Sequence, residues 1–222
     1  MRTLYHHWLD ANCRKIRILL AEKKLECQLE LEKMWKPRET FTKLNPSGRI
    51  PVLVDLNDTV VCENYAICEY LEEAYPERNF LGDNIYSRAE TRRLVSWFDN
   101  KFNEDVTQKI VFEKIYKRYF NMGHPDATAM RDGQKNFFQH LDYISYLIDR
   151  RHWLAGDTYS LADITAAAHL SSLDFLGDVS WDRWPLVKDW YMRIKSRPTF
   201  RPLLNDNIPG VTPPVYYKNL DF

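Results

Sequence analysis

Two short stretches of this chain carry residue types that suit the binding of a small peptide-like ligand. Ile50-Pro51 comes directly before the apolar run Val52–Val54, and a proline there removes one hydrogen-bond donor from a strand. If the bond before it is cis, the backbone of Ile50 turns outward, where a ligand can pair with it. Glu63-Asn64 opens a helical segment, so free helix N–H groups and a carboxylate are expected near the same edge. The pattern predicts a corner that binds a ligand with both an amine and a carboxylate.

Glu63 and Asn64 have a second interpretation, as an ordinary helix start. An acidic residue in the first turn complements the helix dipole, and an Asn side chain can cap unpaired N–H groups. The sequence leaves ligand binding and helix capping open for these two residues.

Cys13 is the sharpest candidate for thiol chemistry. It lies at the start of a segment with helical apolar spacing and is followed by Arg14 and Lys15. A helix N-terminus and nearby cations both lower the pKa of a thiol, and the thiolate could then form mixed disulfides. The alternative is a small residue packed inside the fold, and both interpretations stay open.

His6 and His7 invite a metal site together with Cys13, but their spacing fits no established zinc pattern. Neighbouring strand residues also point to opposite faces of a sheet. We therefore expect no metal and interpret both histidines as structural or surface residues.

Composition and charge exclude several classes of protein. The chain has 222 residues, 45% of them apolar, with 31 basic and 31 acidic residues and a formal net charge of zero. It offers no basic footprint for nucleic acid, and no stretch is long and apolar enough to span a membrane. The four cysteines show no CxxC spacing and no apolar leader opens the chain, so we expect reduced thiols in the cytoplasm.

The first third of the chain alternates strand and helix signals. A strand-helix-strand unit is followed by a hairpin and a helix, which is the thioredoxin-like order. The expected elements are Thr3–His6, Cys13–Lys24, Cys27–Leu31, Val52–Val54, Thr59–Val61 and Glu63–Ala74. We expect a thioredoxin-like domain over residues 1–80.

Residues 86–205 are predicted to form an all-helical domain. Apolar positions recur at helical spacing from Arg88 to Phe120, and a regular stripe follows between Met130 and Ile148, so two long antiparallel helices are expected. Ser160 and Asp163 form a capping-box pattern ahead of an uncharged helix that should run through the core. Residues 206–222, rich in proline, are predicted to form an extended tail that folds back or reaches a partner.

These motifs together resemble the glutathione S-transferase superfamily over nearly the whole chain. The resemblance implies that the backbone of Ile50, before Pro51, pairs with the cysteinyl part of glutathione. It also implies that Glu63 and Asn64 hold the γ-glutamyl amine and carboxylate. Most members have Ser in the second of these positions, and Asn64 can still donate a hydrogen bond to a carboxylate.

The residue that activates the glutathione thiol in this superfamily is a Tyr, Ser or Cys. Setting Lys15-Ile16-Arg17 against the corresponding run of zeta and omega members places Asp10 there. An ionised carboxylate cannot donate a hydrogen bond and raises the pKa of a nearby thiol. The nearby substitutes are Tyr5, Asn12 and Cys13.

Within the superfamily, the chain resembles the FzlA-like FtsZ-binding division proteins of alphaproteobacteria. The shared features are the opening Leu4–His7, the run Val95–Asp99, the helix around Ala166–Leu170 and the end Tyr217–Phe222. The resemblance implies a homodimer that binds FtsZ in the cytoplasm at the division site, with a vestigial or repurposed glutathione site.

The competing expectation is a glutathione-dependent transferase or a thiol-disulfide enzyme. A third, a scaffold for another protein, has only the fold in its favour. One observation bears most on the choice: whether the space beside Ile50, Glu63 and Asn64 is open or is filled by Trp8, Trp35 or the tail.

Overall fold

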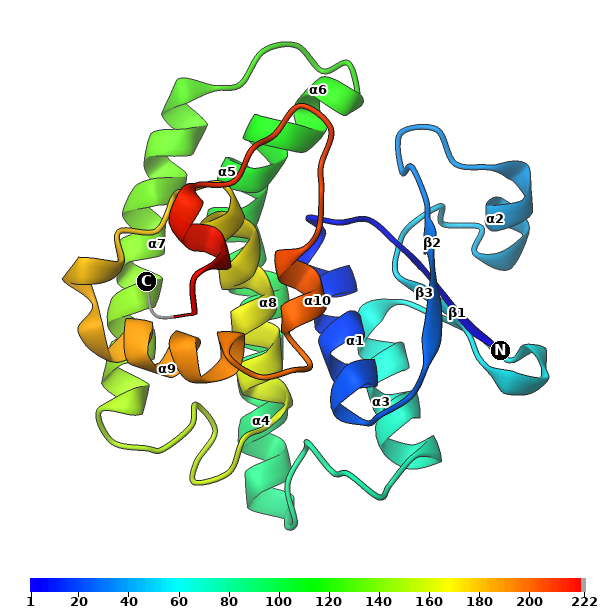
Figure 1. Ribbon diagram of the computed structural model, residues 1–222, viewed down its shortest axis with the longest axis horizontal. Coiled ribbons are helices and arrows are strands. Elements are labelled where there is room, and N and C mark those ends of the chain that lie inside the picture. The colour runs from blue at the N-terminus through cyan, green and yellow to red at the C-terminus, as the bar shows by residue number, and fades with distance from the viewer. Residues whose placement is uncertain (221–222) are drawn as a thin grey trace.

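Residues 1–220 are described by a computed structural model, in which a small sheet with its helices lies beside a larger set of helices (Figure 1). The N-terminal part consists of β1 (Arg2–His6), α1 (Ala11–Glu22), β2 (Cys27–Leu31), α2 (Glu39–Leu44), β3 (Val52–Val54), β4 (Val60–Cys62) and α3 (Asn64–Ala74). This is the predicted order, with α2 added.

The sheet has the strand order β2-β1-β3-β4. β1 runs parallel to β2, with Leu4 opposite Leu29, and antiparallel to β3, with Leu4 opposite Leu53. Helices α1 and α3 cover one face and α2 lies on the other (Figure 1). Leu4 and Leu53 are fully buried. The predicted thioredoxin-like domain is confirmed.

The turn between β3 and β4 follows its sequence signal. Asn57 and Asp58 both have a φ of 59°, a left-handed conformation that Asn and Asp tolerate better than most residues. Helix α2 was not predicted, because its six residues bury only Phe41 and are too few to show a helical period.

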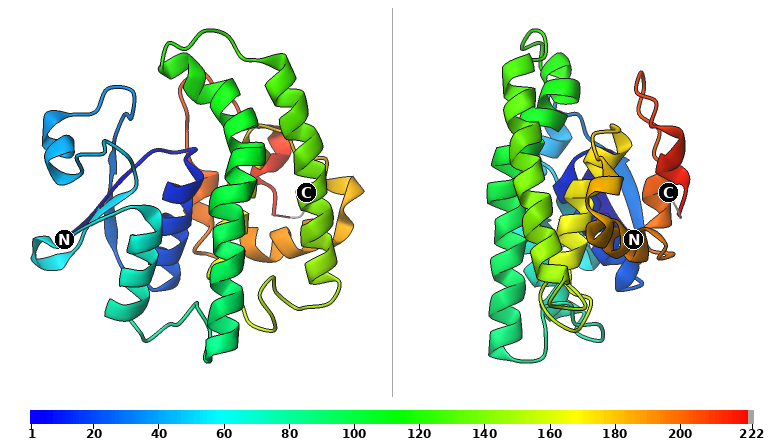
Figure 2. Two further views of the ribbon diagram at one scale, coloured as in Figure 1. Left: turned by 180° about the vertical axis from the view of Figure 1, so that it is seen from behind. Right: turned by 90° about the vertical axis from the view of Figure 1, so that its left-hand side faces the viewer.

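The C-terminal part is helical, as predicted. Its elements are α4 (Ile85–Ser96), a π-helical segment (Trp97–Thr107), α5 (Gln108–Val111), a second π-helical segment (Phe112–Tyr116), α6 (Lys117–Tyr119), α7 (Ala127–Ile148), α8 (Leu161–Phe175), α9 (Pro185–Lys195) and α10 (Arg201–Leu204). Residues 85–119 form one continuous helical run, which differs from the expected regular helix in its wider π-type turns. Helix α7 runs back beside it (Figure 2).

Helix α8 passes through the core, and every residue in it is buried. Asp163 Oδ2 accepts hydrogen bonds from Ser160 N at 3.0 Å and from Ser160 Oγ at 2.9 Å. Asp163 Oδ1 accepts from Leu154 N and from Trp190 Nε1, each at 2.9 Å. Asp163 therefore ties the start of α8 to two other segments, beyond the capping role expected for it.

The tail folds back on the body, as Figure 1 shows in red. It contains a 3₁₀ turn over Val215–Lys218, in which Tyr217 is fully buried against Phe175. The last two residues of the predicted tail, Asp221 and Phe222, lie outside the described residues. In residues 1–220 no helix has the length and apolar character needed to cross a membrane.

Candidate functional site

The predicted corner begins at Ile50 and Pro51, whose peptide bond is cis. Ile50 is 7% exposed and packs in a small apolar cluster with Cys13, Phe41 and Val52. This cluster brings the end of the loop before β3 against the first turn of α1.

Glu63 lies directly before α3 and has a φ of 70°, which is unusual for a residue other than glycine. Its side chain is exposed and makes no capping hydrogen bond. The Glu63 side chain therefore does not cap α3 by a hydrogen bond, although its charge lies at the end of the helix where a carboxylate complements the helix dipole. Its carboxylate is available to a ligand.

The side chain of Asn64 is held by Lys15, a cation of α1. Lys15 Nζ donates to Asn64 Oδ1 at 3.0 Å and to Asp99 Oδ2 at 2.5 Å, and the Lys15 side chain is fully buried. Burial acts to raise the pKa of Asp99, but Lys15 and His169 outweigh it and hold that pKa below its ordinary value. The buried pair between α1 and the helical domain is therefore charged at neutral pH.

An open hollow of about 250 Å³ lies beside Glu63 and Asn64. The remaining lining residues are Tyr65, Val95, Ser96, Asp99 and Asn100. Neither Trp8 nor Trp35 lines it: Trp8 packs against His6, and Trp35 stacks on Tyr119 with ring centroids 4.4 Å apart. The space is therefore open on the Glu63 and Asn64 side of the corner.

Asp10 is the N-cap of α1, and its Oδ1 accepts a hydrogen bond from Cys13 N at 2.8 Å. Burial raises the pKa of this carboxyl. Asp10 also lines a second hollow, of about 220 Å³, together with Asn12, Thr107 and Tyr116. At this hollow Asp10 Oδ1 is a hydrogen-bond acceptor, whereas activation of a glutathione thiol needs a hydrogen-bond donor.

Cys13 is fully buried. Burial and the nearby Asp10 carboxyl raise the pKa of the thiol well above its ordinary value. This direction is opposite to the one expected from the neighbouring Arg14 and Lys15, because these cations point into ion pairs with carboxylates far along the chain. A buried thiol with a raised pKa is a poor nucleophile.

The other two substitutes for a thiol activator lie in different places. The Tyr5 ring packs on Phe41 with centroids 5.4 Å apart, and Tyr5 lines neither of the two hollows. Asn12 lines the second hollow, and its buried Oδ1 has no hydrogen-bond partner in the described part of the chain. The structure thus brings Asn12 to a hollow and keeps Tyr5 away from both.

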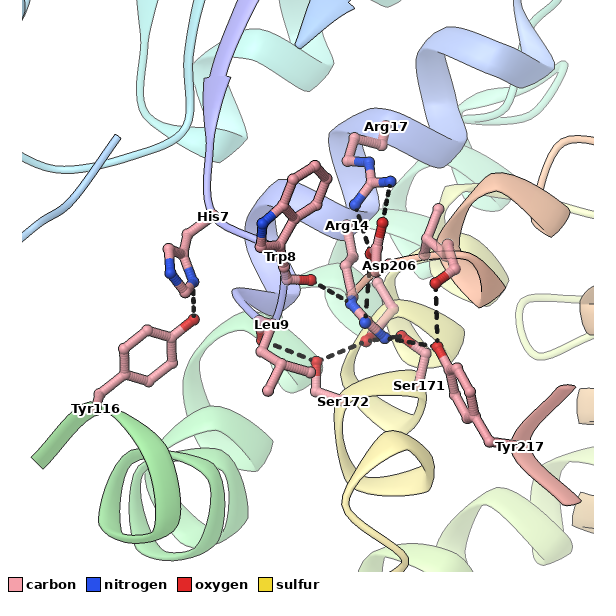
Figure 3. Close-up of polar contacts among 12 residues, drawn as sticks. His7, Trp8, Leu9, Arg14, Arg17, Tyr116, Ser171, Ser172, Asp206 and Tyr217 are labelled. Atoms are coloured by element: carbon pink, nitrogen blue, oxygen red, sulfur yellow. Dashed lines mark hydrogen bonds and ion pairs between the residues drawn. The ribbon is translucent and has the colours of Figure 1, made fainter. Parts of the chain in front are cut away.

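Tyr116 was missed by sequence reasoning. Its hydroxyl lies 3.0 Å from His7 Nδ1 (Figure 3). Tyr116 also lines the second hollow. Burial lowers the pKa of His7 to about 4, so the ring is neutral at pH 7. The only sequence signal was the helical spacing of apolar residues, which cannot show that residues 109 positions apart meet. Within residues 1–220 no group of His, Cys, Asp and Glu is arranged to hold a metal ion.

A second cluster of charged groups lies under the tail. Arg14 Nη1 donates to Ser171 Oγ at 2.9 Å and to the Tyr217 hydroxyl at 3.3 Å (Figure 3). Asp206 accepts two hydrogen bonds of 2.8 Å from Arg17 and lies 3.5 Å from Arg14 Nη2. We call this set the tail clasp, because it fixes the tail to α1 and α8.

Comparisons with known proteins match both parts of the chain. The glutathione S-transferase N-terminal domain family matches residues 11–74, and the C-terminal domain family matches residues 107–198. FtsZ-localized protein A of Caulobacter vibrioides is 46% identical, over 100% of this chain and 98% of that protein.

Two solved structures are similar over the full length. A glutathione S-transferase from Rhodospirillum rubrum F11 is 51% identical, with a TM-score of 0.97 and 100% of both chains covered. FzlA from C. crescentus is 46% identical, with a TM-score of 0.96, over 100% of this chain and 99% of that one.

Proposed function

This chain belongs to the glutathione S-transferase superfamily, and we propose that it is an FzlA-like cell-division factor that binds FtsZ rather than a detoxification enzyme. The observation that carries the proposal is the 46% identity to FtsZ-localized protein A over the whole chain, including the helical domain and the tail. The proposed partner is FtsZ, the proposed location is the cytoplasm at the division site, and the proposed assembly is a homodimer.

The chemistry at the start of α1 supports this choice. Asp10 is a half-buried acceptor at the second hollow, and Cys13 is a buried thiol whose pKa is raised. An ionised Asp10 would repel a glutathione thiolate, and the buried Cys13 thiol is inaccessible to one. A weakened catalytic site is compatible with a role in binding another protein.

Sedimentation with purified FtsZ tests the proposal. We expect the chain to pellet with FtsZ filaments formed with GTP at near-physiological salt, and to stay in the supernatant with GDP or without FtsZ. Light scattering of the purified chain, without FtsZ, should show a mass twice that of one chain. Failure to pellet with GTP-formed filaments would remove FtsZ binding.

A second candidate function is favoured by the open hollow at Glu63 and Asn64. We propose that this hollow binds the γ-glutamyl part of a ligand such as glutathione, with Glu63 facing the amine; Ile50 and Pro51 do not line it, and the backbone of Ile50 is proposed to pair with the cysteinyl part. In a transferase, Asn12 is the candidate polar group at the second hollow, whereas Tyr5 lies away from it.

Immobilised glutathione tests this second candidate. The expected result is retention of the chain that is lost in Glu63→Ala and kept in Glu77→Ala. Glu77 is an exposed carboxylate in the turn that follows α3. Turnover of a chlorodinitrobenzene-type electrophile would add transferase activity, and reaction of native Cys13 with a glutathione mixed disulfide would add thiol-disulfide exchange. No retention of the wild-type chain would remove glutathione binding.

A further inference from the structure

The orientation of the Asn64 side chain is set by its contact with Lys15. A lysine ammonium has three donors and no acceptor, so its partner on an amide side chain is the carbonyl oxygen. Lys15 Nζ lies 3.0 Å from Asn64 Oδ1. The other end of the same amide, its NH₂ group, is then the end left for the hollow that Asn64 lines.

We propose that Lys15 is a positioning residue for the hollow beside Glu63 and Asn64, where it commits the Asn64 NH₂ group to donate to a ligand carboxylate. The proposal rests on ligand binding at this hollow, the second candidate function, and is independent of FtsZ binding. It adds a residue that touches no ligand and a preference for one ligand group.

Lys15 suits this role because its own side chain is held in place by burial and by an ion pair. Its side chain is fully buried, and Asp99 Oδ2 holds the same ammonium at 2.5 Å from the side of the helical domain. Without this hold, an Asn amide can turn over and present either its donor or its acceptor to a ligand. An amide held in one orientation favours a carboxylate, since a charge-assisted hydrogen bond is stronger than a neutral one.

Two ligands distinguish the two orientations of Asn64. Glutathione carries an α-carboxylate on its γ-glutamyl group, and its α-carboxamide analogue carries an uncharged amide there. We expect wild-type protein to prefer glutathione by roughly tenfold or more in a calorimetric titration at pH 7, the size of one charge-assisted hydrogen bond.

The variant that tests Lys15 is Lys15→Met combined with Asp99→Asn. This pair of changes removes both partners of the buried ion pair, so no unpaired charge is left inside the protein. We expect the preference for the carboxylate to fall to within about threefold, as the freed amide turns over. Circular dichroism and thermal unfolding check that the variant folds.

Asn64→Ser supplies the matched background. A hydroxyl rotates to donate or accept as needed, so it does not depend on Lys15 for its orientation. In the Asn64→Ser background we therefore expect the Lys15→Met and Asp99→Asn changes to cause no fall in the preference for the carboxylate, even though Asp99 itself lines the hollow. Glu77→Gln, at an exposed position in the turn after α3, should alter nothing.

Three results would overturn the proposal. A wild-type preference below about twofold would show that Asn64 presents no committed donor. An unchanged preference in the Lys15→Met and Asp99→Asn variant, or an equal loss in the Asn64→Ser background, would show that Lys15 acts on the structure in general. If wild-type protein binds neither ligand, the second candidate function fails as well, whereas the other two results leave that function standing.

Discussion

Two adjacent residues of α1, Arg14 and Lys15, reach two very different regions of the molecule. Both side chains are fully buried, and each pairs with an aspartate far along the chain, Asp206 for Arg14 and Asp99 for Lys15. Consecutive residues on a helix point about 100° apart, so the two cations face different neighbours. Arg14 enters the tail clasp, and Lys15 lies behind an open hollow.

The difference lies in what covers each cation. The tail lies over Arg14, and the guanidinium donates to groups from several segments, among them Ser171 and Tyr217. Lys15 is covered instead by its partners Asn64 and Asp99, both of which line the hollow. These two neighbouring buried cations therefore have different surroundings: Arg14 ties the tail to the body, and Lys15 holds the side chain of a residue that lines an open hollow.

The largest expected effect is on the clasp. Asp206→Ala leaves Arg14 and Arg17 buried without their carboxylate, and breaking such a buried pair costs about 3–5 kcal/mol. We expect that loss in the free energy of unfolding, measured with urea. Glu77→Ala, at an exposed position, should change it by less than about 0.5 kcal/mol. A loss below about 1 kcal/mol for Asp206→Ala would mean that the clasp does not hold the fold.

The next effect is on pH dependence. The pKa of His7 is about 4 in the folded chain against 6.5 ordinarily, so the unfolded chain binds more protons between these values. The contribution of His7 to the free energy of unfolding is therefore fully present above pH 6.5 and is lost as the pH is lowered toward 4, by at most about 3 kcal/mol. Urea unfolding at pH 7 and at pH 4.5 should show a smaller fall in His7→Asn than in the wild-type chain. Equal falls would contradict burial of a neutral His7.

A smaller effect is expected at the end of the clasp. Tyr217→Phe keeps the buried ring and removes the hydroxyl, which accepts from Arg14 and donates to Leu203 O at 3.3 Å. We expect a loss of about 1–2 kcal/mol, seen as a lower melting temperature in calorimetry. Tyr216→Phe, in the same turn but half-buried, is the comparison. If the Tyr217→Phe protein is as stable as wild type, the packing of the Tyr217 ring alone holds the tail, and the hydroxyl contributes nothing.

The smallest effect is expected at Glu63, beside the open hollow, and it is a gain in stability where the other three changes give a loss. Glu63 has a φ of 70°, a backbone conformation that is strained for a residue with a side chain and not for glycine. Glu63→Gly removes this strain and should raise the free energy of unfolding by about 1 kcal/mol. The same change removes the carboxylate, so retention on immobilised glutathione should be lost. A less stable Glu63→Gly protein would show that the Glu63 side chain serves the fold.

Much of the fold was predictable from short-range patterns. The turn at Asn57 and Asp58, the box of Ser160 and Asp163 and the apolar core helix α8 all depend on neighbours a few residues away. Glu63 and Asn64 were found as site candidates for the same reason, since they mark a helix start. Helix α2 escaped because one buried residue, Phe41, gives no period to recognise.

The sequence by itself determined the order of strands and helices, the superfamily and the residues at the corner. Tertiary structure decided which of them can act: it buried Cys13 and raised its thiol pKa, left Glu63 free, and placed Lys15 against Asn64. The physical reason is the separation along the chain of the residues that interact. Hydrogen bonds of turns and helices form between near neighbours, whereas burial and ion pairs such as Lys15 with Asp99, 84 positions apart, exist only once distant segments have packed together.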